Sequence, residues 1–449
     1  MKVVNAPDSI DVDAVRVGMF VHLDLGWLSH PFPLSSFKVT SQEQITTIRS
    51  LGLKRVRWSP QQSDLPAMVA SRSSPGAASA SAGEPELGVE AAAEAALGSP
   101  AATAAPAAPD TPQHLPERAA HKQQLAAQAA ALALCERQFT EAARDCERLT
   151  HLIPTEPQLA RGQAEALTQA LRDKMLADSE INIRLLTDAA GNKASMHALN
   201  VTIVSLLMGR ALELPEAEMQ DLGVGAMLHD IGKLDLPDRL RHREEHFTAV
   251  ESRLYEEHVG NGVALARRMG LSPGAMLVLA QHHEHADGSG FPLHVKTDRM
   301  TAASRIVALV NRYDNLCNPA TLGAAMTPHE ALSLLFAHYK AKFDTAILGA
   351  FIKMMGVYPP GSTVQLSDER YALVVGVNPT RPLKPRVLVH EPGVPRDEAL
   401  LLALDSTPGL GIRRSVGHRQ LPRPARDYLA PGARVAYFFE STRGDLRAA

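Results

Sequence analysis

At 449 residues the chain is too long for a single ordinary domain, and it has a formal net charge of −3 with acidic and basic residues interspersed. This balance excludes a basic stripe for a nucleic-acid polymer and a polybasic patch for a membrane surface. No apolar run reaches the roughly 18 residues of a membrane span, and the start, MKVVNAPDSIDVD, lacks a signal-peptide core. We therefore expect a soluble, cytoplasmic protein.

The first predicted unit is a small α+β module at residues 1–63. MFVHLDL, FKVT and KRVRW have strand character, and Ser41 and Gln44 have the spacing of a capping box that begins a short amphipathic helix. From 64 to 118 the composition becomes Ala, Ser, Pro and Gly, and no aromatic residue occurs between Trp58 and Phe139. Such a segment buries too little apolar surface to offset its chain entropy, which predicts a disordered linker.

A helical connector is predicted at 119–184, where Ala alternates with charged and amide residues. Cys135 and Cys146 lie eleven residues apart on one face of this helix, and that face fits either the protein's own core or the seam of a homodimer. With Cys317 they make three cysteines without CxxC spacing, as expected in a reducing compartment.

The main domain is predicted at 185–356, where the sequence has the pattern of a helical bundle. After YPPGS, the segments STVQLS, RYALVVGV, PRVLVHE and ARVAYFF predict a small β-rich region at 357–449. The predicted fold class is therefore mainly α: an all-helical bundle with a small α+β N-terminal module, a disordered linker and a β-rich C-terminal appendage.

Five predicted helices of the main domain each bring a ligand-type side chain onto an apolar face. A single inward-facing histidine is usually a neutral core residue with one hydrogen bond. Several histidines and an HD pair in one bundle are costly to bury unless a metal ion takes up their lone pairs. The side chains concerned are His197, His229, Asp230, His258, His282, His283, Asn311 and Asp314.

Imidazole and carboxylate ligands without thiolates suit iron, manganese, zinc or nickel and argue against a structural zinc site. His282 and His283 diverge by about 100° on a helix and so serve two metals more easily than one. Asp230 is the candidate bridge between two metals, since a carboxylate has two oxygens. Lys233 follows on the same face, either to meet an anionic oxygen or as a solvated lysine at a helix C-terminus.

Three motifs resemble the HD-GYP family, a branch of the HD phosphohydrolase superfamily. They are LHDIGK at 228–233, EEH ending at His258, and HHEHADGSGFP at 282–292, in the family's order. The stretch VGMFVHLDLGW is similar to a domain that often precedes HD-GYP domains in bacteria. The resemblance implies an all-helical catalytic domain with two metal ions, iron or manganese, that hydrolyses cyclic di-GMP to the linear dinucleotide or to GMP.

The resemblance also implies roles for individual residues. His197, His229 and Asp230 would hold the first metal, Asp230 would bridge to a second held by His258, His282 and His283, and Lys233 would meet the phosphate. The loop with Gly288, Gly290, Phe291 and Pro292 would control substrate access and dock a diguanylate cyclase or another signalling protein. Glu284 and Asp314 would support the ligands.

The sequence departs from the family pattern at several positions. Asn311 stands where the family usually has Asp as the last ligand of the first metal, which predicts weaker binding of that metal. Phe291 replaces a Tyr, and Lys193 and Ala194 stand where some relatives have a Glu for a third metal, so we expect two. No Arg or Lys occurs between Arg312 and Lys340, where the family often has basic residues that contact the substrate phosphates.

Three hypotheses follow. The first is a working phosphodiesterase for cyclic di-GMP, favoured by the nearly complete ligand set. The second is a regulatory or binding module with little turnover, favoured by Asn311 and the missing basic segment. The third is an HD phosphohydrolase that acts on another phosphoester, which the altered segment permits.

Overall fold

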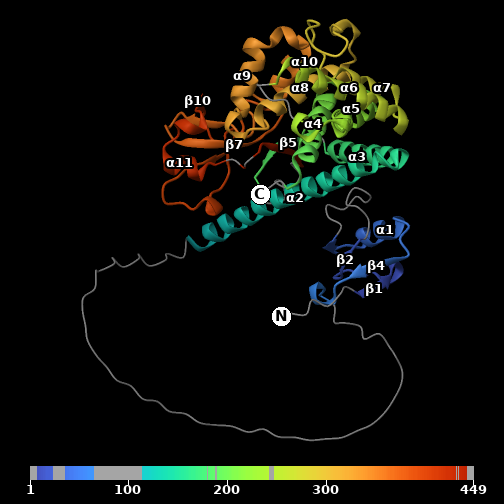
Figure 1. The fold of residues 1–449 in the computed structure, drawn as a ribbon. Coiled ribbons are helices and arrows are strands. Elements are labelled where there is room, and N and C mark those ends of the chain that lie inside the picture. Colours follow the sequence, from blue (N-terminus) through green and yellow to red (C-terminus); the bar gives the residue numbers. More distant parts are fainter. Residues whose placement is uncertain are drawn as a thin grey trace, which may run out of the picture. The chain divides into compact units, whose positions relative to one another are not determined.

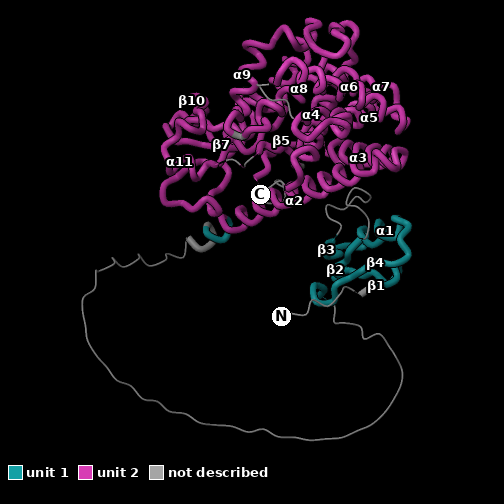
Figure 2. Tube along the Cα trace, in the orientation of Figure 1, with its two compact units in different colours: residues 1–24, 36–120 teal, residues 25–35, 121–449 magenta. Residues whose placement is uncertain are grey.

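The structure is a computed structural model that describes residues 8–23, 36–64, 114–178, 180–187, 190–241, 247–430, 432 and 434–441. The chain divides into two compact units (Figure 2), a small one whose described residues begin at Asp8 and a large one that runs from His121 onward. Most of the predicted linker at 64–118 lies outside the described residues. Within the ranges above, no helix is long and apolar enough to cross a membrane.

The small unit is an α+β module, as predicted. Its sheet has the order β1-β4-β2-β3, all pairs being antiparallel. These strands are β1 (Asp8–Asp11), β2 (Phe20–His22), β3 (Ser36–Lys38) and β4 (Arg55–Trp58), with helix α1 (Gln42–Ser50) between β3 and β4. The predicted capping box is half formed: Ser41 caps the Gln44 N–H, but the Gln44 side chain accepts from Thr40 instead of Ser41.

The large unit is a bundle of helices beside a sheet (Figure 1). Its helices are α2 (His114–Leu152), α3 (Pro157–Leu176), α4 (Lys193–Ala211), α5 (Glu216–Leu228), α6 (Ala249–Met269), α7 (Pro273–Gln281), α8 (Ala302–Cys317), α9 (Pro328–His338), α10 (Thr345–Met355) and α11 (Arg423–Tyr428). Helix α2 begins inside the range assigned to the linker. Cys135 and Cys146 of α2 are buried in the core of this same chain, which is the first of the two interpretations given above.

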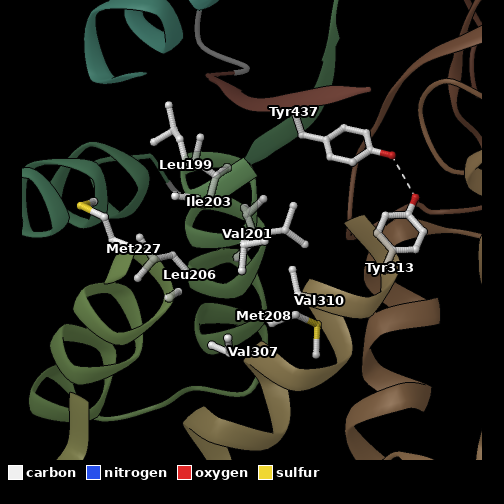
Figure 3. Packing of buried hydrophobic residues seen from close by; sticks show 14 of the residues in the cluster. Leu199, Val201, Ile203, Leu206, Met208, Met227, Val307, Val310, Tyr313 and Tyr437 are labelled. Carbon is white, nitrogen blue, oxygen red and sulfur yellow. Dashed lines mark hydrogen bonds between the residues drawn. The ribbon is translucent and has the colours of Figure 1, made fainter. Parts of the chain in front are cut away.

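Helix α4 is the central helix, since every residue from Ala198 to Gly209 is buried and most of them are apolar. Leu199, Ile203 and Leu206 are fully buried, and they pack with Met227 of α5 and Val307 of α8 (Figure 3). A helix that is hydrophobic all round must be surrounded by other elements. This position carries the first residues of α4, including His197, into the middle of the unit.

The C-terminal strands are part of the large unit rather than a separate appendage. The seven-stranded sheet has the path β10-β6-β7-β5-β11, and β8 pairs with β7 and β9. Its strands are β5 (Ile181–Leu186), β6 (Thr363–Leu366), β7 (Tyr371–Val377), β8 (Arg386–Val389), β9 (Leu402–Ala403), β10 (Ile412–Ser415) and β11 (Ala436–Ser441). Strand β5 was not predicted, although Ile181 to Leu185 alternate between apolar and polar residues; all six residues of the strand are buried. Strand β5 pairs with β11 and β7, so the end of the predicted connector is part of this sheet.

Candidate metal centre

Four helices position histidines of the candidate site, two of them at their C-terminal ends. His229 and His282 are the C-cap residues of α5 and α7, His258 lies in the third turn of α6, and His197 lies in the second turn of α4. A capping box of Thr248 and Glu251 starts α6. The site therefore draws one ligand-type side chain from each of four helices.

Gly232 has a packing role that the sequence reading missed. Helix α5 ends at Leu228, and Gly232 lies in the short 3₁₀ helix that follows (Ile231–Asp235). A Cβ atom at Gly232 would lie 1.8 Å from the carbonyl oxygen of His258. Only glycine permits this approach of the HD segment to α6, so this residue brings Asp230 close to His258.

The predicted ligands form two groups that share Asp230. The ligand atoms of His197, His229 and Asp230 lie within 4.8 Å of one another, and so do those of the second group: Asp230, His258, His282 and His283. One oxygen of Asp230 is 3.4 Å from His229 Nε2, and the other is 3.6 Å from His258 Nε2. The described residues thus present two ligand groups with one carboxylate between them.

Backbone carbonyls fix which ring nitrogen of each histidine carries the proton. Nδ1 of His229 donates to the Ala226 carbonyl at 2.7 Å, Nδ1 of His282 donates to the Leu279 carbonyl at 2.8 Å, and His258 donates likewise to Tyr255. A carbonyl oxygen only accepts, so in a neutral ring the other nitrogen, Nε2, has a free lone pair.

These lone pairs face one another. His258 Nε2 is 3.3 Å from His282 Nε2, and His197 Nε2 is 3.3 Å from His229 Nε2. Burial lowers the pKa of His258 to about 3 and also lowers the pKa of His282, so these rings are neutral at pH 7 and no proton separates their lone pairs. Facing lone pairs repel one another, and a shared cation removes the repulsion.

Two polar atoms of the cluster are buried without a hydrogen-bond partner, namely Oδ1 of Asp230 and Nε2 of His283. Buried polar atoms normally have partners, and orphaned ones need an explanation. Both atoms belong to the second ligand group, where a divalent metal ion would satisfy them. The donor set of imidazoles and one carboxylate therefore fits transition metals of the iron and manganese type.

Lys233 gives the centre a fixed positive charge. Its ammonium donates to Asp230 Oδ2 at 2.6 Å and lies 5.3 Å from the ring centre of Tyr255. Burial acts to lower the pKa of Lys233, but Asp230 and Tyr255 outweigh it and raise that pKa. Burial acts to raise the pKa of Asp230, but Lys233 and His229 hold it well below its usual range. Both groups are therefore charged at pH 7.

Asp314 supports the first ligand group instead of joining it. It is 2% exposed and accepts from His197 Nδ1 at 2.5 Å, from Asn318 at 2.9 Å and from Asn200. Asn200 and Asn318 were not predicted as part of the site. Asn200 lies three residues after His197, and Asn318 lies four residues after Asp314. Helical spacing of this kind was the signal that could have identified them.

Asn311 is buried as predicted, at 3% exposure, in a stripe with Ile306 and Val310. Its side-chain oxygen accepts a hydrogen bond from Asn315 Nδ2 at 2.6 Å. The atom that would bind metal therefore already uses one of its two lone pairs on a neighbour one turn further along the same helix. Asn315 was not predicted as part of the site.

The predicted access loop covers the second ligand group. Phe291 stacks on His283, with ring centres 4.5 Å apart and planes at 24°. Gly290 is required there, since a Cβ would lie 2.4 Å from the His283 carbonyl oxygen. Glu284 is 1% exposed and accepts from the backbone N–H groups of Leu293 and Val295, so it holds the loop rather than a metal. Gly288 has a positive φ in the same loop.

The ligand groups open into a cavity of about 1270 Å³. Asp230, His282, His283 and Asn311 are among the residues that line it. Pockets for drug-sized ligands have volumes of about 300–1,000 Å³, so this cavity has room for a ligand larger than a mononucleotide.

Comparison with known proteins places these features in a family context. Residues 167–347 match the model of the HD domain, and residues 8–164 match a domain of unknown function, DUF3391. The resemblance that the motifs indicated is thereby confirmed, and the chain carries an HD domain preceded by a DUF3391 domain.

The chain is 27% identical over 384 residues to a cyclic di-GMP phosphodiesterase of Pseudomonas aeruginosa, covering 85% of this chain and 84% of that protein. It is 23% identical over 198 residues to a cyclic di-GMP phosphodiesterase of Borreliella burgdorferi, covering 44% of this chain and 52% of that protein. A solved structure of an HDG"Y"P protein from Bdellovibrio bacteriovorus aligns with a TM-score of 0.40 and 11% identity, over 77% of this chain and 97% of that one.

Proposed function

For this chain, in which an HD domain follows a DUF3391 domain, we propose metal-dependent hydrolysis of cyclic di-GMP to the linear dinucleotide or to GMP. The observation that carries the proposal is the pair of ligand groups that share Asp230 in the wall of a large cavity. The similarity to cyclic di-GMP phosphodiesterases supports the choice of substrate.

The proposed centre holds two divalent ions, iron or manganese. His197, His229 and Asp230 would bind the first, with Asn311 as a weak additional ligand, and Asp230, His258, His282 and His283 would bind the second. When bound, such a pair of ions supplies an activated water and neutralises the charge that develops on the phosphoryl group.

The protein's own side chains position the substrate and the ligands. Lys233 keeps its proton because Asp230 stabilises the charge, and it can meet a non-bridging phosphate oxygen. Asp314 fixes the ring of His197 through Nδ1, and Phe291 fixes the ring of His283 by stacking. We propose that the loop of Phe291 also controls access to the cavity and docks a diguanylate cyclase or another signalling protein.

A second candidate function is a regulatory module that binds cyclic di-GMP with little turnover. One observation favours it: the oxygen of Asn311 is already engaged by Asn315, which leaves the first ligand group with three strong ligands. In that case the cavity would serve binding, and the signal would pass through the N-terminal unit.

The test is anaerobic reconstitution with Fe²⁺ or Mn²⁺, followed by chromatographic analysis of products from cyclic di-GMP, 3'3'-cGAMP and simple phosphodiesters. Hydrolysis of cyclic di-GMP that is lost in Asp230→Ala and kept in the exposed control Asp298→Ala supports the proposal. Tight binding without turnover in either metal contradicts it and favours the regulatory function. Turnover confined to another phosphoester assigns the chain to the third hypothesis.

A further inference from the structure

Six basic side chains line the cavity, and they come from separate parts of the chain: Lys193, Lys233, Arg241, Arg312, Lys342 and Arg434. Four of them have a partner that balances or shields the charge. Lys233 pairs with Asp230, Arg241 pairs with Asp238 at 2.9 Å, and Arg312 and Lys342 lie over the ring of Tyr339 at 5.3 and 5.4 Å. Among the described residues, Lys193 and Arg434 have no carboxylate or aromatic partner of this kind.

Arg434 is held at the end of helix α8. Its Nη1 donates to the carbonyls of Asn318 and Pro319 at 3.4 and 3.5 Å. The Asn318 side chain binds both the N–H and the carbonyl of Val435 at 2.8 Å, which fixes the backbone next to Arg434. The guanidinium therefore lies beside the first residues after α8. In the sequence that follows them, no Arg or Lys occurs before Lys340.

The strand after Arg434 is anchored to the bundle as well. The hydroxyl groups of Tyr437 in β11 and Tyr313 in α8 are 2.9 Å apart and both residues are buried (Figure 3). Asn200 of α4 accepts from the Tyr437 N–H at 2.9 Å. These bonds place a C-terminal residue in the cavity wall with little freedom to move, as a binding residue requires.

Lys193 is the first residue of α4, where the helix dipole also favours an anion. Burial, together with the nearby charges of Arg434 and Lys233, lowers the pKa of Lys193 to about 8. Among the described residues, no acidic group acts to raise this pKa. Like charges gathered without a counter-ion destabilise the free protein, and an arriving anion relieves the repulsion.

We propose that Arg434 and Lys193 bind a phosphate group of the substrate other than the one at the metal centre. In this arrangement the C-terminal strand region supplies the charge that the segment after α8 lacks. The inference rests on the proposed function, because it requires a substrate with two phosphates. A cyclic dinucleotide has a second phosphate, whereas a simple phosphodiester has only one phosphate.

The experiment compares two substrates in the metal-reconstituted full chain: cyclic di-GMP, with two phosphates, and bis(p-nitrophenyl) phosphate, with one. The variants are Arg434→Gln, Lys193→Gln and the double variant. Matched controls are Arg423→Gln, whose side chain is 84% exposed, and Lys340→Gln, which is exposed and lies over Phe336. Each loss of a charged hydrogen bond to phosphate is expected to raise KM for cyclic di-GMP about tenfold or more.

The proposal predicts this rise in KM with kcat within about threefold, and a KM for bis(p-nitrophenyl) phosphate that changes less than about twofold. Equal effects on both substrates, or no effect on either, overturn it while leaving the proposed function intact. If the wild-type protein hydrolyses neither substrate, the proposed function fails, and calorimetric binding of cyclic di-GMP decides the inference. Tenfold weaker binding in the variants then supports it, whereas equal binding, or no binding by the wild type, overturns it.

Discussion

Replacing Asp314 by asparagine is expected to remove a metal ligand by changing the tautomer of His197. The carboxylate accepts three hydrogen bonds, from His197 Nδ1, Asn200 and Asn318. An asparagine can satisfy the two amide donors with its oxygen, but its NH₂ group then faces His197. Two donors cannot bond, so the His197 proton moves to Nε2, the atom that lies 3.6 Å from Asp230.

A protonated Nε2 has no lone pair for the metal. Loss of a supporting partner of a metal-bound histidine typically costs 10–100-fold in metal affinity, which corresponds to about 1.4–2.7 kcal/mol. Because the second ligand group does not include His197, the loss is expected for one metal ion per chain and not for both.

The assay is calorimetric titration of the metal-free protein with Mn²⁺, combined with ¹⁵N NMR of the histidine rings to identify the tautomer. The control is Asp298→Asn, an exposed carboxylate outside the cavity lining, which is expected to bind metal as the wild type does. If Asp314→Asn binds two ions with unchanged affinity, or if His197 keeps its proton on Nδ1, the reasoning is refuted.

Three further outcomes are expected. Asn311→Asp is expected to raise the metal occupancy measured by elemental analysis, because a carboxylate is a stronger ligand than an amide already bonded to Asn315. An unchanged occupancy would mean that position 311 does not bind metal. Gly232→Ala is expected to lower the free energy of unfolding, measured in urea, by about 1–3 kcal/mol, because the new Cβ meets the His258 carbonyl. The control Gly260→Ala places its Cβ in open space and is expected to leave the stability unchanged. Equal stabilities of the two variants would contradict the close contact at Gly232. The metal-free protein loses stability as pH falls from about 6.5 to about 3, because His258 stays neutral in the fold while it binds a proton in the unfolded chain. From pH 7 to pH 5 this residue accounts for about 2 kcal/mol, and a slope unchanged in His258→Gln would exclude it as the cause.

The sequence could group the candidate histidines because apolar stripes on helices have a fixed period, while their role as metal ligands stays a prediction. His197, His229 and His258 were expected to point inward, and the structure brings each of them to Asp230. The motifs also predicted the loop with Phe291, although its stacking on His283 needed the structure.

The residues that the sequence did not predict act between segments far apart in the chain. Asn200 and Asn318 tie Asp314 to the strand after Val435, and the pairing of β5 with β11 makes that strand part of the large unit. No local pattern places Arg434 in the cavity, since its position depends on a pairing across about 250 residues of sequence.

In the proposed function, two metal ions that share Asp230 perform the hydrolysis. The most direct measurement is the rate of cyclic di-GMP hydrolysis as metal-free protein is titrated anaerobically with Fe²⁺ or Mn²⁺. Activity is expected to stay low up to one ion per chain and to rise to a plateau near two. Full activity in the metal-free protein or with a single ion, or no activity with two ions bound, would contradict it.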